Sequence, residues 1–229
     1  PMTQTSNNRV ALAMVATYVV LWGTGYWPTE VAGRHTETVM SSLAEAGPPA
    51  GDAPESPATP LRQPLDGVKV LETANVIAGP TGGKLLSDLG AEVIKLEPPN
   101  GDISRSGLTP YFYVLNSNKR SVAVNARTEE GKGVAVSLAS TVDILLANMR
   151  PGATDRIGIG SEALAKLNPA IIEAHVTAFG WTGPYSHRAG LDPLAQALIG
   201  LQRAQGGPEN PPVYLRALAP TDYVAGALG

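Results

Sequence analysis

The chain of 229 residues carries a formal net charge of −3, is 43% hydrophobic and contains no cysteine. This length and apolar content suffice for a soluble globular core, whereas the lack of a Lys/Arg cluster argues against nucleic-acid binding, which depends on neutralising phosphates. The absence of cysteine excludes disulfide frameworks, thiolate nucleophiles and cysteine-based zinc sites, and is compatible with the cytoplasm. The three histidines are scattered and form no metal-ligand pair, so we expect no metal site.

Residues 11–27, ALAMVATYVVLWGTGYW, carry no charged side chain. A membrane-spanning or signal segment is one interpretation, but the run is at the lower limit of a spanning length, Gly23 and Gly25 interrupt it, and no clear cleavage site follows. We favour a buried or partner-packed helix and assign residues 1–43 to an N-terminal apolar extension. Residues 44–64 are rich in Pro, Ala and Gly, which predicts a linker before a compact domain at 65–229.

From residue 65 onward, strand-like and helix-like segments alternate. VKVLET at 68–73 and EVIKLE at 92–97 are typical of short strands, and GPTGGKLLSDLG at 79–90 has helical spacing with a glycine stop. The same alternation continues with a helix at 128–141, a strand at 142–148, a helix at 161–168 and a strand at 170–179. This pattern predicts an α/β domain with a parallel sheet, helices on both faces and right-handed crossovers.

The loop after the first predicted strand, ANVIAGPTGGK at 74–84, matches neither common phosphate-binding motif. Its glycines are spaced one residue too closely for a P-loop, Leu85 replaces the hydroxyl residue that would hold magnesium, and no G-x-G-x-x-G is present. A glycine-rich turn that leads into a helix still offers backbone N–H groups to a ligand. Ligand contact and close packing of the helix on the sheet both stay open.

Two clusters of basic side chains follow. The first cluster surrounds a short strand and consists of Lys119, Arg120 and Arg127. We favour solvent-exposed charges along the edge of the sheet over a phosphate-binding role for these side chains. Arg150 and Arg156, together with Asn148, follow a buried strand at its carboxyl end, where open α/β sheets bind ligands.

The loop after the strand at 170–179 is rich in turn residues and carries Tyr185, His187 and Asp192. We favour a surface position for His187 over a general-base role. The final segment, APTDYVAGALG, places Thr221 and Asp222 where a helix begins, and either residue could cap that helix. A carboxylate there would also be held ionised by the helix N-terminus, as a nucleophile requires, so Asp222 has two open roles.

Taken together, these segments resemble the family III CoA-transferases of the CaiB/BaiF type, which include formyl-CoA transferase and carnitine CoA-transferase, with α-methylacyl-CoA racemase as a relative. The resemblance covers residues 64–229 and leaves 1–63 aside, apart from a loose similarity of VVLWGTGYWPTEVAGR to a later helical stretch of the family. The matching segments are PLDGVKVLETANVIAGP, LLSDLGAEVIKLEPPNGD, YFYVLNSNKRSVAVNARTEEGK, VDILLANMRPGATDRIGIG, LNPAIIEAHVTAFGWTGPY, GLDPLAQALIGL and PPVYLRALAPTDYVAG.

The resemblance implies a Rossmann-like large domain, an interlocked homodimer and the transfer of CoA between an acyl-CoA and a small carboxylic acid, with CoA as substrate and no prosthetic group. The nucleophilic aspartate of the transferases corresponds to Asp222, which would form a mixed anhydride and then an aspartyl-CoA thioester. The positions that the resemblance assigns to CoA binding are Val76, Ile77, Ala78, Arg127, Asn148, Arg150 and Arg156.

The chain also departs from its relatives at informative positions. The racemase places a proton-transferring histidine where this chain has Leu191, which favours the transferase. Ile77 replaces a glutamine of formyl-CoA transferase, which weakens oxalate or formate as substrates. The family continues through further helices and a small domain beyond its catalytic aspartate, so we expect a truncated large domain. A racemase-like isomerase and a non-catalytic fragment with the CoA-binding fold stay open as alternatives.

Overall fold

The computed structural model describes residues 62–215 and 219–228, which belong to one compact unit that begins at Arg62. The predicted extension at 1–43 and nearly all of the predicted linker at 44–64 lie outside the described residues. So does the apolar run at 11–27. None of the helices in the described ranges is long and apolar enough to cross a membrane.

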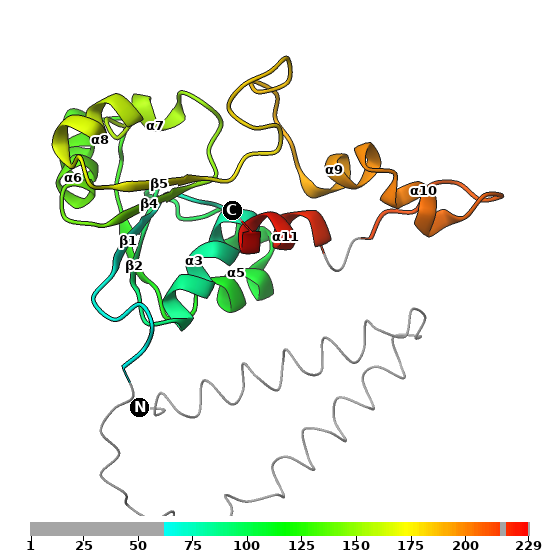
Figure 1. Ribbon diagram of the computed structural model, residues 1–229, viewed down its shortest axis with the longest axis horizontal. Coiled ribbons are helices and arrows are strands. Elements are labelled where there is room, and N and C mark those ends of the chain that lie inside the picture. Colours follow the sequence, from blue (N-terminus) through cyan, green and yellow to red (C-terminus); the bar gives the residue numbers. More distant parts are fainter. Residues whose placement is uncertain (1–61, 216–218, 229) are drawn as a thin grey trace, which may run out of the picture. The chain divides into compact units, whose positions relative to one another are not determined.

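Five parallel strands form one sheet within the described residues (Figure 1). The strand order is β3-β2-β1-β4-β5, so the chain builds outward from β1 in one direction and then returns to build outward on the other side. Such a reversal of order opens a crevice at the carboxyl ends of the two central strands. The strands are β1 (Lys69–Glu72), β2 (Glu92–Glu97), β3 (Arg120–Ala123), β4 (Ile144–Ala147) and β5 (Ile172–His175).

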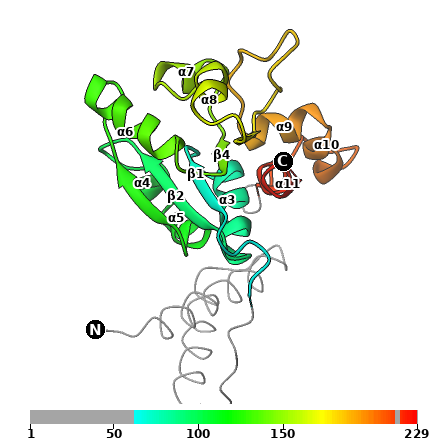
Figure 2. The ribbon, with the colours of Figure 1, turned by 60° about the vertical axis from the view of Figure 1, so that its left-hand side comes forward.

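Helices cover both faces of the sheet, as the alternating pattern predicts (Figures 1 and 2). On one face, Leu71 and Leu145 pack against alanines of α6 (Glu129–Ala139) and against Leu164 of α8 (Ser161–Leu167). On the other face, Val70 and Leu146 pack against apolar side chains of α3 (Ala78–Asp88). Because neighbouring strand residues point to opposite faces, each central strand contributes to both layers of core. The chain therefore has the predicted α/β fold.

The helices follow the strands in the expected order, with several short additions in the loops. Thr128 caps α6 by accepting a hydrogen bond from the Gly131 N–H, and Glu129 and Glu130 occupy the first turn, where the helix dipole favours negative charge. The helices are α3 (Ala78–Asp88), α4 (Ser104–Gly107), α5 (Thr109–Asn116), α6 (Glu129–Ala139), α7 (Ala153–Arg156), α8 (Ser161–Leu167), α9 (Asp192–Leu198), α10 (Leu201–Gly206) and α11 (Pro220–Leu228).

Helix α11 lies directly beside α3 in both ribbon views (Figures 1 and 2). A Cβ atom added to Gly226 would lie 2.1 Å from the Ala78 carbonyl oxygen, and one added to Gly82 would lie 3.0 Å from the Gly226 carbonyl oxygen. A Cβ at Gly83 would lie 1.9 Å from the Glu72 carboxylate. The glycines of the GPTGGK segment are therefore required for close packing, which brings α11 to the carboxyl edge of the sheet.

Candidate active site

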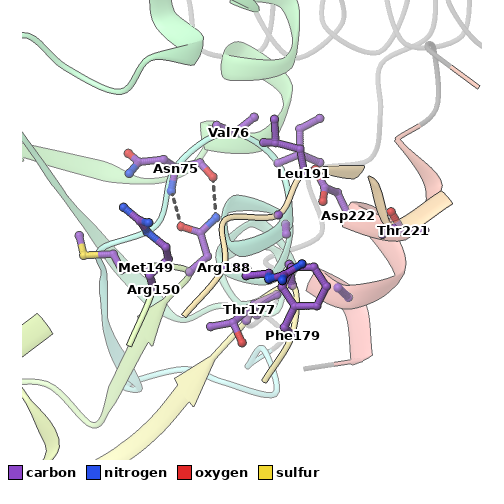
Figure 3. Close-up of a pocket in the computed structure, with 18 of the residues that line it drawn as sticks. Asn75, Val76, Met149, Arg150, Thr177, Phe179, Arg188, Leu191, Thr221 and Asp222 are labelled. Atoms are coloured by element: carbon purple, nitrogen blue, oxygen red, sulfur yellow. Dashed lines mark hydrogen bonds between the residues drawn. The ribbon is translucent and has the colours of Figure 1, made fainter. Parts of the chain in front are cut away.

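A cavity of about 460 Å³ lies at the carboxyl ends of β1 and β4, where the strand order reverses. Figure 3 shows Thr221 and Asp222 of α11 on one side of this cavity and Asn75, Met149 and Arg150 on the opposite side. The loop after β5 and helix α9 supply the remaining wall. The cavity is therefore assembled from three loops of the sheet and from helices α9 and α11.

The loop after β1 is joined to the loop after β4 by one side chain. Asn148 Oδ1 accepts a hydrogen bond of 2.9 Å from the Asn75 N–H, and Asn148 Nδ2 donates one of 2.7 Å to the Asn75 carbonyl oxygen (Figure 3). A Cβ on Gly79 would lie 2.3 Å from the Ala74 Cβ, so α3 also starts in close contact with this loop. These contacts fix the floor of the cavity before any ligand is bound.

Val76 stands out in this loop because its φ angle is +67°. The left-handed region is disfavoured for a β-branched residue, since its Cβ crowds the backbone. Such a conformation costs on the order of 1–3 kcal/mol and persists only where the surrounding structure over-determines it. Val76 lines the cavity, so the strained residue lies at the candidate site (Figure 3).

Asp222 is the third residue of α11, which begins at Pro220, and is not its cap. The Thr221 N–H instead donates to Asp192 Oδ1 over 2.9 Å, and the Thr221 hydroxyl also bonds to Asp192. Asp192 is 4% exposed and accepts a further hydrogen bond from Gln196. The capping role expected of Thr221 or Asp222 is therefore wrong, because a buried carboxylate from α9 supplies it.

The half-buried Asp222 carboxylate lines the cavity. Burial, together with the nearby Asp192 carboxylate, raises the pKa of Asp222 to about 6. The helix N-terminus is expected to hold this carboxylate ionised, but desolvation and a like charge instead shift its pKa upward. At neutral pH the group is still mostly ionised, and it is a more basic carboxylate than an exposed aspartate.

The structure brings together part of the predicted set of site residues. Val76, Ile77, Ala78, Asn148 and Arg150 line the same cavity as Asp222. Arg127 and Arg156 are exposed and do not line this cavity.

One cavity residue was not predicted. Arg188 lines the cavity from the loop after β5, residues 177–190, which we call the outer wall. Its guanidinium lies 4.6 Å from the centre of the Tyr185 ring. The signal available in the sequence was a basic residue in a long loop after a strand, the same signal that singled out Arg150. Leu191, at the position of the racemase histidine, also lines the cavity, whereas His187 is exposed, as expected.

The two basic residues at the start of β3, Lys119 and Arg120, differ in their surroundings. Arg120 is exposed and pairs with Glu92, as expected of a rim charge. Lys119 is not a rim charge, because its side chain is 1% exposed and its amino group lies 2.6 Å from Glu72 Oε2. Local sequence gives no sign of this burial, since the partner is 47 residues away.

An open parallel sheet with a cavity at its strand-order reversal is typical of doubly wound α/β proteins, which as a class bind ligands at this edge. The chain matches the profile of CoA-transferase family III over residues 65–229 and belongs to that family.

The relatives support the same assignment. The succinyl-CoA–D-citramalate CoA-transferase of Chloroflexus aurantiacus is 41% identical over 179 residues, which cover 72% of this chain and 44% of that protein. The succinyl-CoA:glutarate CoA-transferase of Mus musculus is 41% identical, covering 72% of this chain and 39% of that protein. The crystal structure of a CaiB/BaiF family protein from Brucella suis superposes with a TM-score of 0.69 at 38% identity, covering 72% of this chain and 47% of that one. The chain thus spans less than half the length of these relatives.

Proposed function

We propose that this chain provides the CoA-binding edge and the nucleophile of an enzyme that transfers CoA between an acyl-CoA and a carboxylic acid. The observation that carries this proposal is the half-buried Asp222 carboxylate. It lines the cavity at the strand-order reversal, together with the loops after β1 and β4. Family membership supports the assignment of the reaction class.

In the proposed reaction, an Asp222 oxygen attacks the thioester carbonyl carbon, the C–S bond breaks, and CoA leaves as a thiolate. The product is a mixed anhydride between the acyl group and Asp222. The thiolate then attacks the Asp222 carbonyl carbon and expels the acyl group as a free carboxylate, which leaves an aspartyl-CoA thioester. The acceptor acid reverses both steps, so covalent catalysis divides one difficult displacement into easier ones.

The raised pKa of Asp222 fits this role. A desolvated carboxylate has lost stabilising water and is a stronger nucleophile than an exposed one, yet a pKa of about 6 leaves it mostly ionised at pH 7. Because the negative charge moves from Asp222 to the departing thiolate and carbonyl oxygen, backbone N–H groups of the surrounding loops are the proposed oxyanion donors.

Different residues are proposed to contact different parts of CoA. Val76, Ile77, Ala78, Asn148 and Arg150 are the proposed CoA contacts inside the cavity. Arg127 and Arg156 lie outside it, and we propose them as partners of the CoA phosphates, which extend away from the thioester.

The nature of the acid follows from the relatives and from the charges in the cavity. Relatives are named as transferases acting with succinyl-CoA and D-citramalate, with acetyl-CoA and oxalate, or with succinyl-CoA and glutarate. D-citramalate, oxalate and glutarate each have two carboxyl groups, and a second carboxylate requires a cation beyond the reacting centre. Arg188 of the outer wall is the proposed partner, since guanidinium pairs with carboxylate in a bidentate geometry. We therefore propose a short dicarboxylic acid as substrate.

A racemase-like isomerase is disfavoured because Leu191, in the cavity wall, has no proton to transfer. The interlocked homodimer and the cytoplasmic location stay predictions from the family resemblance and the composition.

The covalent step is tested by trapping. Incubation of the protein with succinyl-CoA and hydroxylamine should leave a hydroxamate on the peptide that contains Asp222, detected by mass spectrometry. Asp222→Asn should give no adduct, whereas Glu209→Gln, at an exposed loop position, should give the wild-type yield.

CoA binding without any adduct in the wild-type protein would contradict the transferase and support a CoA-binding fragment. Exchange of an α-proton with deuterated water, without acyl transfer, would instead support an isomerase.

A further inference from the structure

Four charged side chains are buried beneath the loop after β1: Glu72, Lys95, Asp102 and Lys119. We call this set the buried charge cluster. Glu72, Lys95 and Asp102 are 2% exposed or less, and the side chain of Lys119 is 1% exposed. Burying ions costs several kcal/mol per group before pairing, and an apolar set of similar volume is often at least as stable. A cluster of this kind therefore needs a reason other than stability.

The cluster is electrically balanced and is connected from end to end. Lys95 Nζ lies 2.8 Å from Glu72 Oε1 and 3.0 Å from Asp102 Oδ2. Lys119 Nζ lies 2.6 Å from Glu72 Oε2. Two carboxylates and two ammonium groups thus alternate in one chain of ion pairs, in which each charge lies next to a group of opposite charge.

Two members of the buried charge cluster, Lys95 and Asp102, bond to the backbone of the loop after β1. Lys95 Nζ donates to the Ala74 carbonyl oxygen over 2.6 Å, and the Val76 N–H donates to Asp102 Oδ1 over 3.5 Å. Asp102 Oδ1 is itself fixed by the Ser104 N–H at 2.8 Å and the Ser104 hydroxyl at 2.7 Å. Between these two contacts, both backbone groups of Asn75 bond to Asn148.

Residues 74–76 thus lie between the end of β1 and the start of α3, and the side chains of Lys95, Asp102 and Asn148 supply the backbone hydrogen bonds described above. This is the arrangement that a strained loop requires, because a left-handed Val76 persists only when its neighbours over-determine it. We propose that Lys95 and Asp102 are positioning residues that hold residues 74–76 in the shape that forms the CoA-facing wall of the cavity. The CoA part of this statement rests on the proposed function.

The other two members, Glu72 and Lys119, contact helices α3 and α5. Lys119 Nζ donates to the Pro80 carbonyl oxygen in α3 over 2.9 Å and to Asn116 Oδ1 in α5 over 3.2 Å. Glu72 lies under Gly83 of α3. The cluster therefore offers two matched variants. One replaces the charges of Lys95 and Asp102, the other those of Glu72 and Lys119, and in each case one carboxylate and one ammonium group remain.

The test compares Lys95→Met/Asp102→Asn with Glu72→Gln/Lys119→Met in the full 229-residue chain. For each protein, we would measure the unfolding midpoint in urea, the Kd for CoA by calorimetry, and amide hydrogen exchange at Asn75 and Val76. The first variant should weaken CoA binding about tenfold and speed exchange at these amides about tenfold. The second should leave both within about twofold of wild type at a similar loss of global stability.

Equal effects of the two variants on CoA binding and exchange would overturn the proposal, as would unchanged exchange in Lys95→Met/Asp102→Asn. If the wild-type protein binds no CoA, the proposed function fails, and the exchange comparison still decides the positioning role. If the first variant does not fold, Asp102→Asn alone replaces it. That variant should speed exchange at Val76 and weaken CoA binding, while Lys95 keeps its bond to Ala74.

Discussion

The inner and outer walls of the cavity are built in different ways. The inner wall, residues 74–79, packs Ala74, Ile77 and Gly79 into the interior and is held by the buried side chains of Lys95 and Asp102 and by the partly buried Asn148. The outer wall, residues 177–190, contains no fully buried residue and is stabilised by its own turns and by ring contacts around Tyr185.

This difference matches two tasks in the proposed reaction. A preformed wall binds CoA without first losing conformational entropy, and its cost is the strain at Val76. An exposed loop adjusts more readily to an incoming acid, because few buried contacts must change when it moves. The inner wall should therefore respond strongly to small changes in shape, and the outer wall should tolerate them.

A matched pair of glycine substitutions gives the largest expected contrast. In Gly79→Ala, the new methyl group would lie 2.3 Å from the Ala74 Cβ, so helix α3 or the inner wall must shift. We expect a loss of about 3 kcal/mol in the free energy of unfolding, together with weaker CoA binding. In Gly183→Ala, on the outer wall, nothing lies within 4 Å, and only the φ angle of +94° opposes alanine. We expect a loss of about 1 kcal/mol and unchanged CoA binding.

Urea unfolding and calorimetry with CoA measure both variants of this pair. Similar losses of stability and affinity in the two proteins would contradict the distinction between a rigid and an adaptable wall.

A smaller effect is expected at Asp222, where function and stability oppose each other. The pKa of Asp222 is about 6 in the folded protein, above its ordinary value of 3.8. Between these two pH values the folded state holds a proton that the unfolded state has released, so stability falls as pH rises and the cost is complete above pH 6. Asp222→Asn removes this cost. At pH 7 it should stabilise the protein by about 1 kcal/mol, discounted for solvent screening.

The stabilisation by Asp222→Asn should shrink as the pH falls toward 3.8 and largely vanish by the acid end of the range, where the wild-type carboxyl is mostly protonated in both states. Unfolding midpoints from pH 3.5 to 7.5 measure the dependence, with Glu209→Gln as the exposed control. A constant difference between wild type and Asp222→Asn across this range would mean that the carboxylate is not destabilised by burial.

Much of the fold could be predicted from local patterns. The strand at 92–97 has the predicted bounds, and the predicted helices at 79–90, 128–141 and 161–168 shorten by only a few residues in the structure. These elements are regular, amphipathic and bounded by glycine or capping residues. Helix α5, TPYFYVLN, was not predicted, because its aromatic and β-branched residues are typical of strands, and a proline in its first turn sets the helix instead.

The parts of the site that sequence reasoning missed depend on contacts between distant residues. Asp192 caps α11 from 29 positions away, and its charge contributes to the raised pKa of Asp222. Lys119 is drawn inward by Glu72, although its neighbours in the chain are polar. Periodicity and capping rules describe neighbours within a few residues, so they carry no information on such pairs.

The central claim, that Asp222 forms a covalent bond with the acyl group, is tested most directly by oxygen transfer. Turnover with an unlabelled acyl-CoA and a dicarboxylic acid labelled with ¹⁸O in its carboxyl groups should place one ¹⁸O in the Asp222 carboxylate after the first cycle. This follows because the acceptor oxygen becomes the bridging oxygen of the anhydride and stays on Asp222 when CoA departs with the acyl group. Mass spectrometry of the peptide that contains Asp222 measures the label. Acyl transfer without label in this peptide would contradict the account.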